Sequence, residues 1–541
     1  MSKKIQKIKK KNNASDGLYR SVKIAVPKRL LNSIKLDRLY ETDSLHTEAV
    51  NKWVDKWYER TDRAEAILSG TATGIMQKDS IDMTFPSAYI QIAGNKMLDI
   101  LRSHYLNIQD KIVSSVWQNK DLSAEYKFVF SAFVRNIKLF SSFINQNYAI
   151  DDVISHWNSE FLAKAKNLYL TLTEEQKRNI PQAIYNEFWE IRKNWNRPLF
   201  KGGGIQLDYR VFSIEEARTS THFNLWLKIT TATPHQRISV PFKLTDKKHK
   251  DLELFFPDWQ TNKRKGILVI KDRHIHISIP IFREKQENIP EKHIGLDSGM
   301  TTPASLDSGI CYGNNFIKLV ENDHDEYLKL QATRNKFHAL KKGVRERLEL
   351  TQNPETRKIL ETKIAEYERH LSANRWTRLR NKMKSVVKTE IGRTVNLLLK
   401  DIDPVKTMII MEDLSDMNAK EARRSKRGKF DLSSWSRGEL QNHIKRDIEW
   451  LGGSVAYIAP EYTSQLCNEC GWLEEANRKN KRFCCLNCNY TEDADVNAAK
   501  NIRERFFDVE LRELVKKYFW NKDLRRKKIK ELLESRMKPT A

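Results

Sequence analysis

Four cysteines in two CxxC pairs are the residues whose spacing most clearly indicates chemistry. Cys467 and Cys470 form the first pair, Cys485 and Cys488 form the second, and fourteen residues lie between the pairs. Four thiolates supplied in this way match the tetrahedral coordination of structural zinc. A four-cysteine site leaves no position open for a substrate. We therefore expect Zn²⁺ here to stabilise structure, and Asp495, seven residues beyond the last cysteine, to be closer to the reaction chemistry.

Three acids fall where the ends of structural elements are predicted. Asp297 follows the short apolar strand His293–Leu296, Glu412 follows the apolar strand Met408–Met411, and Asp495 begins a helical pattern. In an α/β sheet, the ends of the strands are where sites assemble. Three carboxylates brought together repel one another unless a hard divalent cation such as Mg²⁺ or Mn²⁺ shares them. Two such ions activate a water molecule and stabilise the leaving oxygen of a phosphodiester.

Each acid taken singly is weak support for catalysis, because an acid at a strand end is more often a cap or a turn residue. Asp413, Glu492 and Asp493 lie beside the candidates, and the sequence does not exclude them. Gly299, in an Asp-x-Gly sequence after the first strand, would allow a nucleic-acid strand to approach the backbone closely.

The composition indicates a polyanionic partner. Lys plus Arg number 96 against 70 Asp plus Glu, a net charge of +26, and 13 Trp, 17 Tyr and 22 Phe accompany them. Basic residues with aromatics suit nucleic-acid binding. The charge is concentrated in an arm at residues 1–15 and a loop at residues 419–429. Six cysteines, four of them in CxxC pairs, favour a reducing compartment. No apolar run of about 18 residues is present, so we expect a cytoplasmic protein without a membrane partner.

The remaining chain divides by its hydrophobic period. A helical period runs from about residue 30 to residue 197, and alternation between residues 200 and 285 predicts an antiparallel sheet or small barrel. An α/β pattern begins at residue 291. Residues 323–400 predict long charged helices, broken near Asn353-Pro354, which we expect to lie along a nucleic-acid backbone.

The order of four motifs resembles a known family. GLDSG, IIMEDLS, APEYTSQLCNECG and CLNCNYTEDADVNAAKNI follow one another as in the split RuvC-type nuclease domain of TnpB proteins and of the compact, miniature type V CRISPR effectors of the V-F and V-U kind. The resemblance spans about residues 291–505, and it is most specific from Tyr462 to Ile502. Residues 86–97 (PSAYIQIAGNKM) are weakly similar to the TnpB helical region.

The resemblance implies roles for individual residues. The catalytic, magnesium-binding acids of the family fall on Asp297, Glu412 and Asp495. A basic residue of the zinc loop assists the family's cleavage, and both Arg478 and Arg482 are candidates. The structural zinc ligands fall on the four paired cysteines, Cys467, Cys470, Cys485 and Cys488, and Cys484 is expected to be a bystander.

The resemblance also implies a multidomain α+β architecture. It combines a helical recognition lobe, a β-barrel wedge domain, and an RNase H-like (RuvC) α/β nuclease domain with an inserted four-cysteine zinc ribbon. The expected segments are a basic arm with the first wedge strand (1–30), the recognition lobe (31–200), the wedge (201–290), the nuclease domain with its helical insertion 323–400 (291–462), the zinc ribbon (463–490), and the last nuclease helix with a basic tail (491–541).

The predicted function is that of an RNA-guided DNA endonuclease whose partners are a guide RNA and target double-stranded DNA. Guide pairing would read the sequence, while the protein reads a short flanking motif. A transposon-encoded TnpB-like nuclease, an RNA-guided DNA binder without efficient cleavage, and a plain zinc-ribbon nucleic-acid-binding protein are the alternatives. All three acids are present, which favours an active nuclease. A homodimer is left open.

Overall fold

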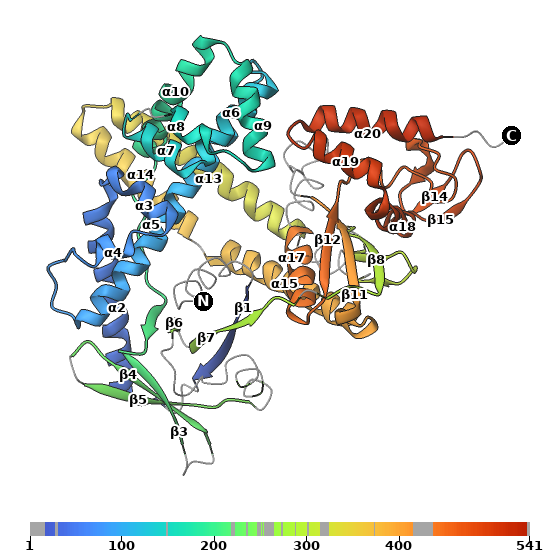
Figure 1. Ribbon diagram of the computed structural model, residues 1–541. Coiled ribbons are helices and arrows are strands. Elements are labelled where there is room, and N and C mark those ends of the chain that lie inside the picture. The colour runs from blue at the N-terminus through green and yellow to red at the C-terminus, as the bar shows by residue number, and fades with distance from the viewer. Residues whose placement is uncertain are drawn as a thin grey trace, which may run out of the picture. The chain divides into compact units, whose positions relative to one another are not determined.

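The chain forms two compact units, residues 1–283 and 284–541, in a computed structural model (Figure 1). The structure describes residues 17–26, 31–147, 150–217, 222–233, 236–245, 250, 253, 265–271, 274–286, 288–299, 302–313, 324–372, 374–414 and 437–537. The basic arm at residues 1–15 and the basic loop at residues 419–429 lie outside these residues. Within the described ranges, no helix is both long enough and apolar enough to cross a membrane.

The first unit is mainly helical between residues 33 and 194, as the sequence predicted. The apolar stripe that contains Trp53 and Trp57 is fully buried in its first long helix. The predicted capping box is confirmed, because the Thr173 hydroxyl and the Gln176 side chain each accept a hydrogen bond from the other residue's backbone N–H. The helices are α2 (Ser33–Tyr58), α3 (Ala64–Ser69), α4 (Thr73–Met76), α5 (Ser87–Gln118), α6 (Ala124–Arg135), α7 (Ile137–Ile144), α8 (Ile150–Ser155), α9 (Glu160–Thr171) and α10 (Glu174–Asn194).

The strands of the first unit lie in two sheets, and no closed barrel is formed by its described residues. One sheet has the order β1-β7-β6-β2, and the other has the order β3-β4-β5. The chain turns tightly between the second and third strands, where Val211 N–H donates to Asp208 O at 3.0 Å, so these two consecutive strands enter different sheets. The barrel prediction is therefore not supported. The strands are β1 (Gly17–Val26), β2 (Ile205–Asp208), β3 (Phe212–Glu216), β4 (Leu225–Thr230), β5 (Arg237–Phe242), β6 (Lys265–Lys271) and β7 (His274–Glu284).

A five-stranded sheet of order β10-β9-β8-β11-β12 organises the second unit. The neighbouring strands β8, β11 and β12 run parallel to one another, and β12 is at the edge of the sheet. Strand β9 pairs antiparallel with β8 on the other side. The parallel pairs require crossover connections, and helices supply them. The strands of this sheet are β8 (Lys292–Asp297), β9 (Ala304–Leu306), β10 (Cys311–Tyr312), β11 (Thr407–Glu412) and β12 (Ser454–Ile458).

Helices cover both faces of this sheet. Ile409 and Met411 of β11 belong to the apolar core that contains residues of α15 and α17, whereas Ile410 packs with Ile502 of α18. Alternate residues of one strand thus serve two cores, which is why the strand reads as continuously apolar. The predicted break at Asn353-Pro354 separates α13 from α14. The helices are α13 (His324–Leu350), α14 (Pro354–Ser372), α15 (Asn374–Asp401), α17 (Arg437–Trp450) and α18 (Ala494–Phe507).

A small three-stranded sheet carries the cysteine segment. Its order is β13-β14-β15, and β15 runs directly into α18. Two further helices pack on this segment through a separate apolar core of Leu473, Leu511, Ile529 and Leu533. The elements are β13 (Arg478–Lys479), β14 (Arg482–Cys484), β15 (Thr491–Asp493), α19 (Val509–Lys517) and α20 (Lys522–Arg536).

Candidate active site and metal centre

Asp297 and Glu412 end neighbouring parallel strands. Leu296 of β8 is in register with Met411 of β11, so the acids that follow these two residues lie side by side at the same edge of the sheet. Both acids are half-buried. The Thr463 hydroxyl donates a hydrogen bond to Glu412 Oε1, which orients this carboxylate.

Asp495 lies in the first turn of α18. Its side chain is only 4% exposed, and the Asp493 carboxylate caps the helix by accepting hydrogen bonds from the backbone N–H groups of Asp495 and Val496 at 2.9 and 3.2 Å. The amino-terminal end of a helix carries a partial positive charge, so a side chain in this first turn is well placed to face other charged groups of the site. The sequence did not exclude Asp493 as an alternative acid. In the structure, Asp493 has a structural role, because it caps the first turn of α18.

The other neighbouring acid of this segment, Glu492, belongs to a separate cluster. Its carboxylate accepts hydrogen bonds from Lys500 Nζ at 2.9 Å and from Tyr490 Oη at 3.3 Å. The hydrogen bond from the Lys500 ammonium lowers the pKa of Glu492. The backbone N–H of Asp413, the third alternative, donates to Ile458 O on the neighbouring strand.

Two glycines let α18 approach the strand that carries Asp297. A Cβ atom on Gly295 would lie 2.0 Å from the Ala499 carbonyl oxygen, so the helix backbone crosses β8 where a side chain is missing. A Cβ atom on Gly299 would lie 3.3 Å from Asp495 Oδ2. The carboxylate of Asp495 is therefore beside the turn that begins two residues after Asp297. The structure thus brings the three predicted acids to one edge of the sheet.

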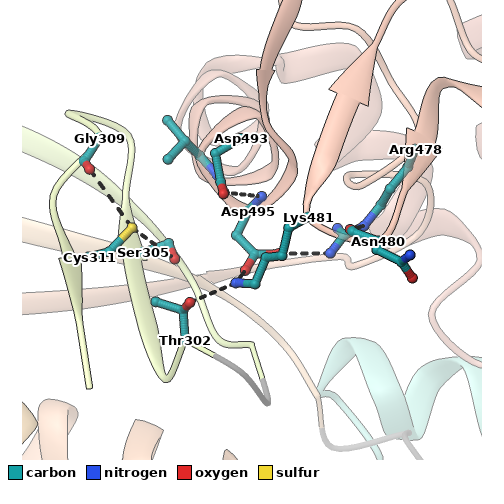
Figure 2. A network of polar contacts seen from close by, with 10 residues as sticks. Thr302, Ser305, Gly309, Cys311, Arg478, Asn480, Lys481, Asp493 and Asp495 are labelled. Carbon is teal, nitrogen blue, oxygen red and sulfur yellow. Dashed lines mark hydrogen bonds and ion pairs between the residues drawn. The ribbon is translucent and has the colours of Figure 1, made fainter. Parts of the chain in front are cut away.

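Two cations from the β13–β14 hairpin hold the Asp495 carboxylate (Figure 2). Arg478 Nη2 lies 2.7 Å from Oδ1, and Lys481 Nζ contacts Oδ2. Lys481 also donates to the Thr302 hydroxyl at 2.6 Å. Of the two arginines predicted from the sequence, Arg478 reaches the acid, while Arg482 is exposed on β14.

Lys481 is the functional candidate that sequence reasoning missed. It follows Asn480, whose backbone is left-handed with a φ of 56°, in the tight turn of this hairpin. Asn tolerates that conformation better than most residues. The turn allows Arg478, two residues before it, and Lys481, one residue after it, to contact Asp495 together. The signal in the sequence was a basic residue on each side of an Asn turn.

The four paired cysteines converge as predicted. Their Sγ atoms all lie within 4.8 Å of one another, and the cluster consists of Cys467, Cys470, Cys485 and Cys488. Four sulfur ligands within this distance fit a tetrahedral metal site of the zinc type. Cys484 lies outside this cluster, where its Sγ accepts a hydrogen bond from the Thr491 hydroxyl at 3.7 Å.

Two buried asparagines of α18 tie the helix to the cysteine segment. Asn497 Nδ2 donates to Leu466 O at 2.9 Å, and Asn501 Nδ2 donates to Leu466 O at 2.7 Å and to Thr463 O at 2.9 Å. Leu466 directly precedes the first cysteine, and Thr463 is the residue that orients Glu412. One network of hydrogen bonds therefore connects the cysteine cluster, the third acid's helix and the second acid. The i, i+4 spacing of the asparagines was the only sign of it in the sequence.

Part of this site is similar to a known protein family. Residues 438–502, which include the cysteine cluster and Asp495, match the family model of the Cas12f1-like TNB domain. This match supports the resemblance to compact TnpB-like type V effectors that the motif order predicted.

Individual relatives agree with this class. A TnpB-like protein of Methanocaldococcus jannaschii is 30% identical over 126 residues, which are 23% of this chain and 45% of the relative. The CRISPR-associated endodeoxyribonuclease Cas12f1 of Sulfoacidibacillus thermotolerans is 38% identical over 109 residues, 20% of this chain and 24% of the relative. The chain thus matches less than half of the length of either protein. These matches confirm the resemblance to compact TnpB-like type V effectors.

A solved structure also aligns with most of the chain. The cryo-EM structure of a Cas12f1–sgRNA–target DNA complex covers 90% of this chain and 99% of its own, with 14% identity and a TM-score of 0.33.

Proposed function

We propose that this chain is an RNA-guided DNA endonuclease that hydrolyses phosphodiesters at Asp297, Glu412 and Asp495. The observation that carries the proposal is the convergence of these acids at one sheet edge, with two cations on the third acid. Relatives that match part of this chain are named as TnpB-like proteins and as RNA-guided or CRISPR-associated endonucleases. Cleavage of DNA is the activity that the endonuclease names have in common.

The donor set fits hard divalent cations. Asp297, Glu412 and Asp495 offer carboxylate oxygens, which are the ligands that Mg²⁺ and Mn²⁺ prefer. Asp495 already pairs with the cationic side chains of Arg478 and Lys481, which supports a role for this carboxylate in balancing positive charge. Two bound Mg²⁺ ions would activate the attacking water and stabilise the leaving oxygen.

The other residues of the site orient the acids and neutralise charge. Thr463 holds the Oε1 atom of Glu412 and so orients this carboxylate. Arg478 and Lys481 hold both oxygens of Asp495 while it is buried, and the same side chains are positioned to contact the scissile phosphate once a metal shares the acid. The Thr302 hydroxyl accepts a hydrogen bond from Lys481 and so helps to hold the ammonium group beside Asp495. Fixed cations of this kind stabilise the charge that develops in the transition state.

The cysteine cluster has a structural role in this proposal. Zn²⁺ bound by the four thiolates would fix the segment that begins one residue after Leu466. Within that segment, Asn468 donates hydrogen bonds to the side-chain oxygens of both asparagines of α18, so the metal would also fix the position of Asp495. No catalytic position is left at a zinc ion with four sulfur ligands.

Guide RNA and target DNA are the proposed partners of the whole chain. The net charge of +26 suits a protein that neutralises many phosphates. The recognition lobe at residues 31–200 and the wedge at residues 201–290 are proposed to hold the guide and its heteroduplex with the target strand, while the second unit cleaves.

The test is the substitution of single acids in the protein purified with its guide RNA. We expect Asp297→Ala and Glu412→Ala to abolish DNA cleavage in Mg²⁺ and to leave guided DNA binding within about twofold, because the acids are needed for metal and not for the guide. Asp413→Ala is the matched control, one residue from Glu412, and should cleave normally. Wild-type cleavage by either of the first two variants would refute the assignment. Loss of cleavage in Asp413→Ala, with normal cleavage in Glu412→Ala, would transfer the role to Asp413.

A further inference from the structure

A cavity of about 400 Å³ with both polar and apolar lining lies beside α5 of the first unit, and its lining contains none of the three acids. Its lining includes Lys96, Asp99, Ser103 and Asn107, which are three or four residues apart and therefore form one stripe along the helix. The other wall is the segment that follows α10, beginning with Trp195. The volume is within the range of sites that bind small ligands.

A buried histidine gives this cavity an unsatisfied polar group. His104 lines the cavity and is 8% exposed, and its Nε2 atom has no hydrogen-bond partner among the residues that the structure describes. Burial, with smaller contributions from Arg192 and Lys111, lowers the pKa of His104 to about 4, so the ring is neutral at physiological pH. A buried polar atom without a partner is costly, and a ligand in the cavity would remove that cost.

The charges around the cavity favour an anionic ligand. Lys111 Nζ lies 3.7 Å from the centre of the Trp195 ring, and Lys96 is part of the lining. Arg192 is close enough to His104 to affect its pKa. The neutral imidazole, the Lys96 ammonium and the Asn107 amide are all able to donate hydrogen bonds to phosphate oxygens.

One carboxylate in the lining restricts which anionic ligands would fit the cavity. Asp99 is exposed at the cavity and forms no salt bridge with another described residue. A carboxylate repels a simple anion, but it accepts a hydrogen bond from a hydroxyl group. A ligand that presents a phosphate and a hydroxyl together satisfies both halves of the lining. A ribonucleotide does so through its 2′-hydroxyl, which a deoxyribonucleotide lacks.

We propose that this α5 cavity binds one nucleotide of an RNA strand, with its phosphate toward Lys96 and Asn107 and its ribose toward Asp99. The inference rests on the proposed function in one respect, that the chain binds RNA. It adds a specific site on the helical unit that distinguishes RNA from DNA.

Two substitutions separate the ribose contact from the phosphate contact. The probes are a fluorescein-labelled single-stranded RNA and the DNA of the same sequence, titrated with the full chain in buffer without Mg²⁺ so that cleavage does not interfere. Asp99→Ala should weaken RNA binding about tenfold and leave DNA binding unchanged or stronger, because a hydrogen bond to a charged group contributes about 1.5 kcal/mol or more. Lys96→Gln should weaken binding of both probes.

The controls remove the same charges elsewhere in the first unit. Asp110→Ala changes an exposed acid on the same helix that pairs with Arg135, and Lys138→Gln changes an exposed lysine on α7; neither lines the cavity. Both should keep the wild-type ratio of RNA to DNA affinity. An unchanged ratio in Asp99→Ala would refute the cavity assignment and leave the nuclease proposal standing. The absence of any RNA binding by the unaltered chain would refute both.

Discussion

The close crossing of α18 over β8 gives the sharpest prediction, because a single methyl group at Gly295 must move the helix. The added Cβ atom would lie 2.0 Å from the Ala499 carbonyl oxygen, whereas ordinary contact begins at 3.4 Å. The helix backbone must therefore retreat by about 1.4 Å. The added Cβ atom would also lie 2.9 Å from the Arg503 backbone nitrogen, so the helix meets the methyl group at two points one turn apart.

The shift is transmitted to catalysis because Asp495 begins the same helix. A displacement of about 1 Å in a catalytic group can reduce the rate about a hundredfold. We therefore expect Gly295→Ala to lower the single-turnover rate of guided DNA cleavage by about two orders of magnitude. Overpacking of this kind costs about 1–3 kcal/mol, so the melting temperature should fall while the second unit still folds.

The assay compares Gly295→Ala with Gly392→Ala at saturating guide RNA. Gly392 lies within α15, and a Cβ atom there would have no neighbour within 4 Å. Alanine is the better helix former, so this control should be as active as the wild type and slightly more stable. If Gly295→Ala folds and cleaves within threefold of the wild-type rate, the helix does not set the position of Asp495 and the reasoning is wrong.

Two further predictions concern the cysteine segment. Cys485→Ser should lose its zinc, as measured by elemental analysis, and DNA cleavage should fall with it because the segment bound by α18 is no longer held by the metal. Cys484→Ser should keep both the zinc and the cleavage rate. The opposite pattern of zinc loss would overturn the ligand assignment. Lys481→Gln should reduce the cleavage rate about tenfold to a hundredfold and leave guided DNA binding unchanged, because it removes one cation from the site. Arg482→Gln changes an exposed residue and should cleave near the wild-type rate. Equal rates for the two variants would exclude a role for Lys481.

Local patterns predicted the parts of this fold whose cause is local. The alternation of buried residues in β7 and the capping box at Thr173 depend on neighbours a few residues away, and both are present in the structure. The CxxC pairs likewise predicted the cysteine cluster, because the spacing within each pair already places two sulfur atoms on one side of a turn.

Features that depend on distant parts of the chain were harder to predict. The contact of Lys481 with Asp495 requires the hairpin turn at Asn480 and the docking of that hairpin on α18. The barrel prediction was not supported because alternation shows that a strand has a buried face, but it does not say which sheet the strand joins. The position of Asp495 beside Gly299 was not predicted, because no pattern within residues 463–501 indicates which strand α18 packs against.

Because α18 covers β8 but is made much later, the sheet stays incomplete for part of the time that the chain is being synthesised. Asp297 and Asp495 are 198 residues apart in the chain. At a translation rate of about 5–20 residues per second, roughly 10–40 seconds pass between them on the ribosome. During this interval the sheet face that includes Ile410 has no helix over it, and the acids at the strand ends have no third partner. On the proposed function, a nascent chain would therefore be unable to cleave DNA, and the apolar sheet face would stay uncovered until α18 has been made.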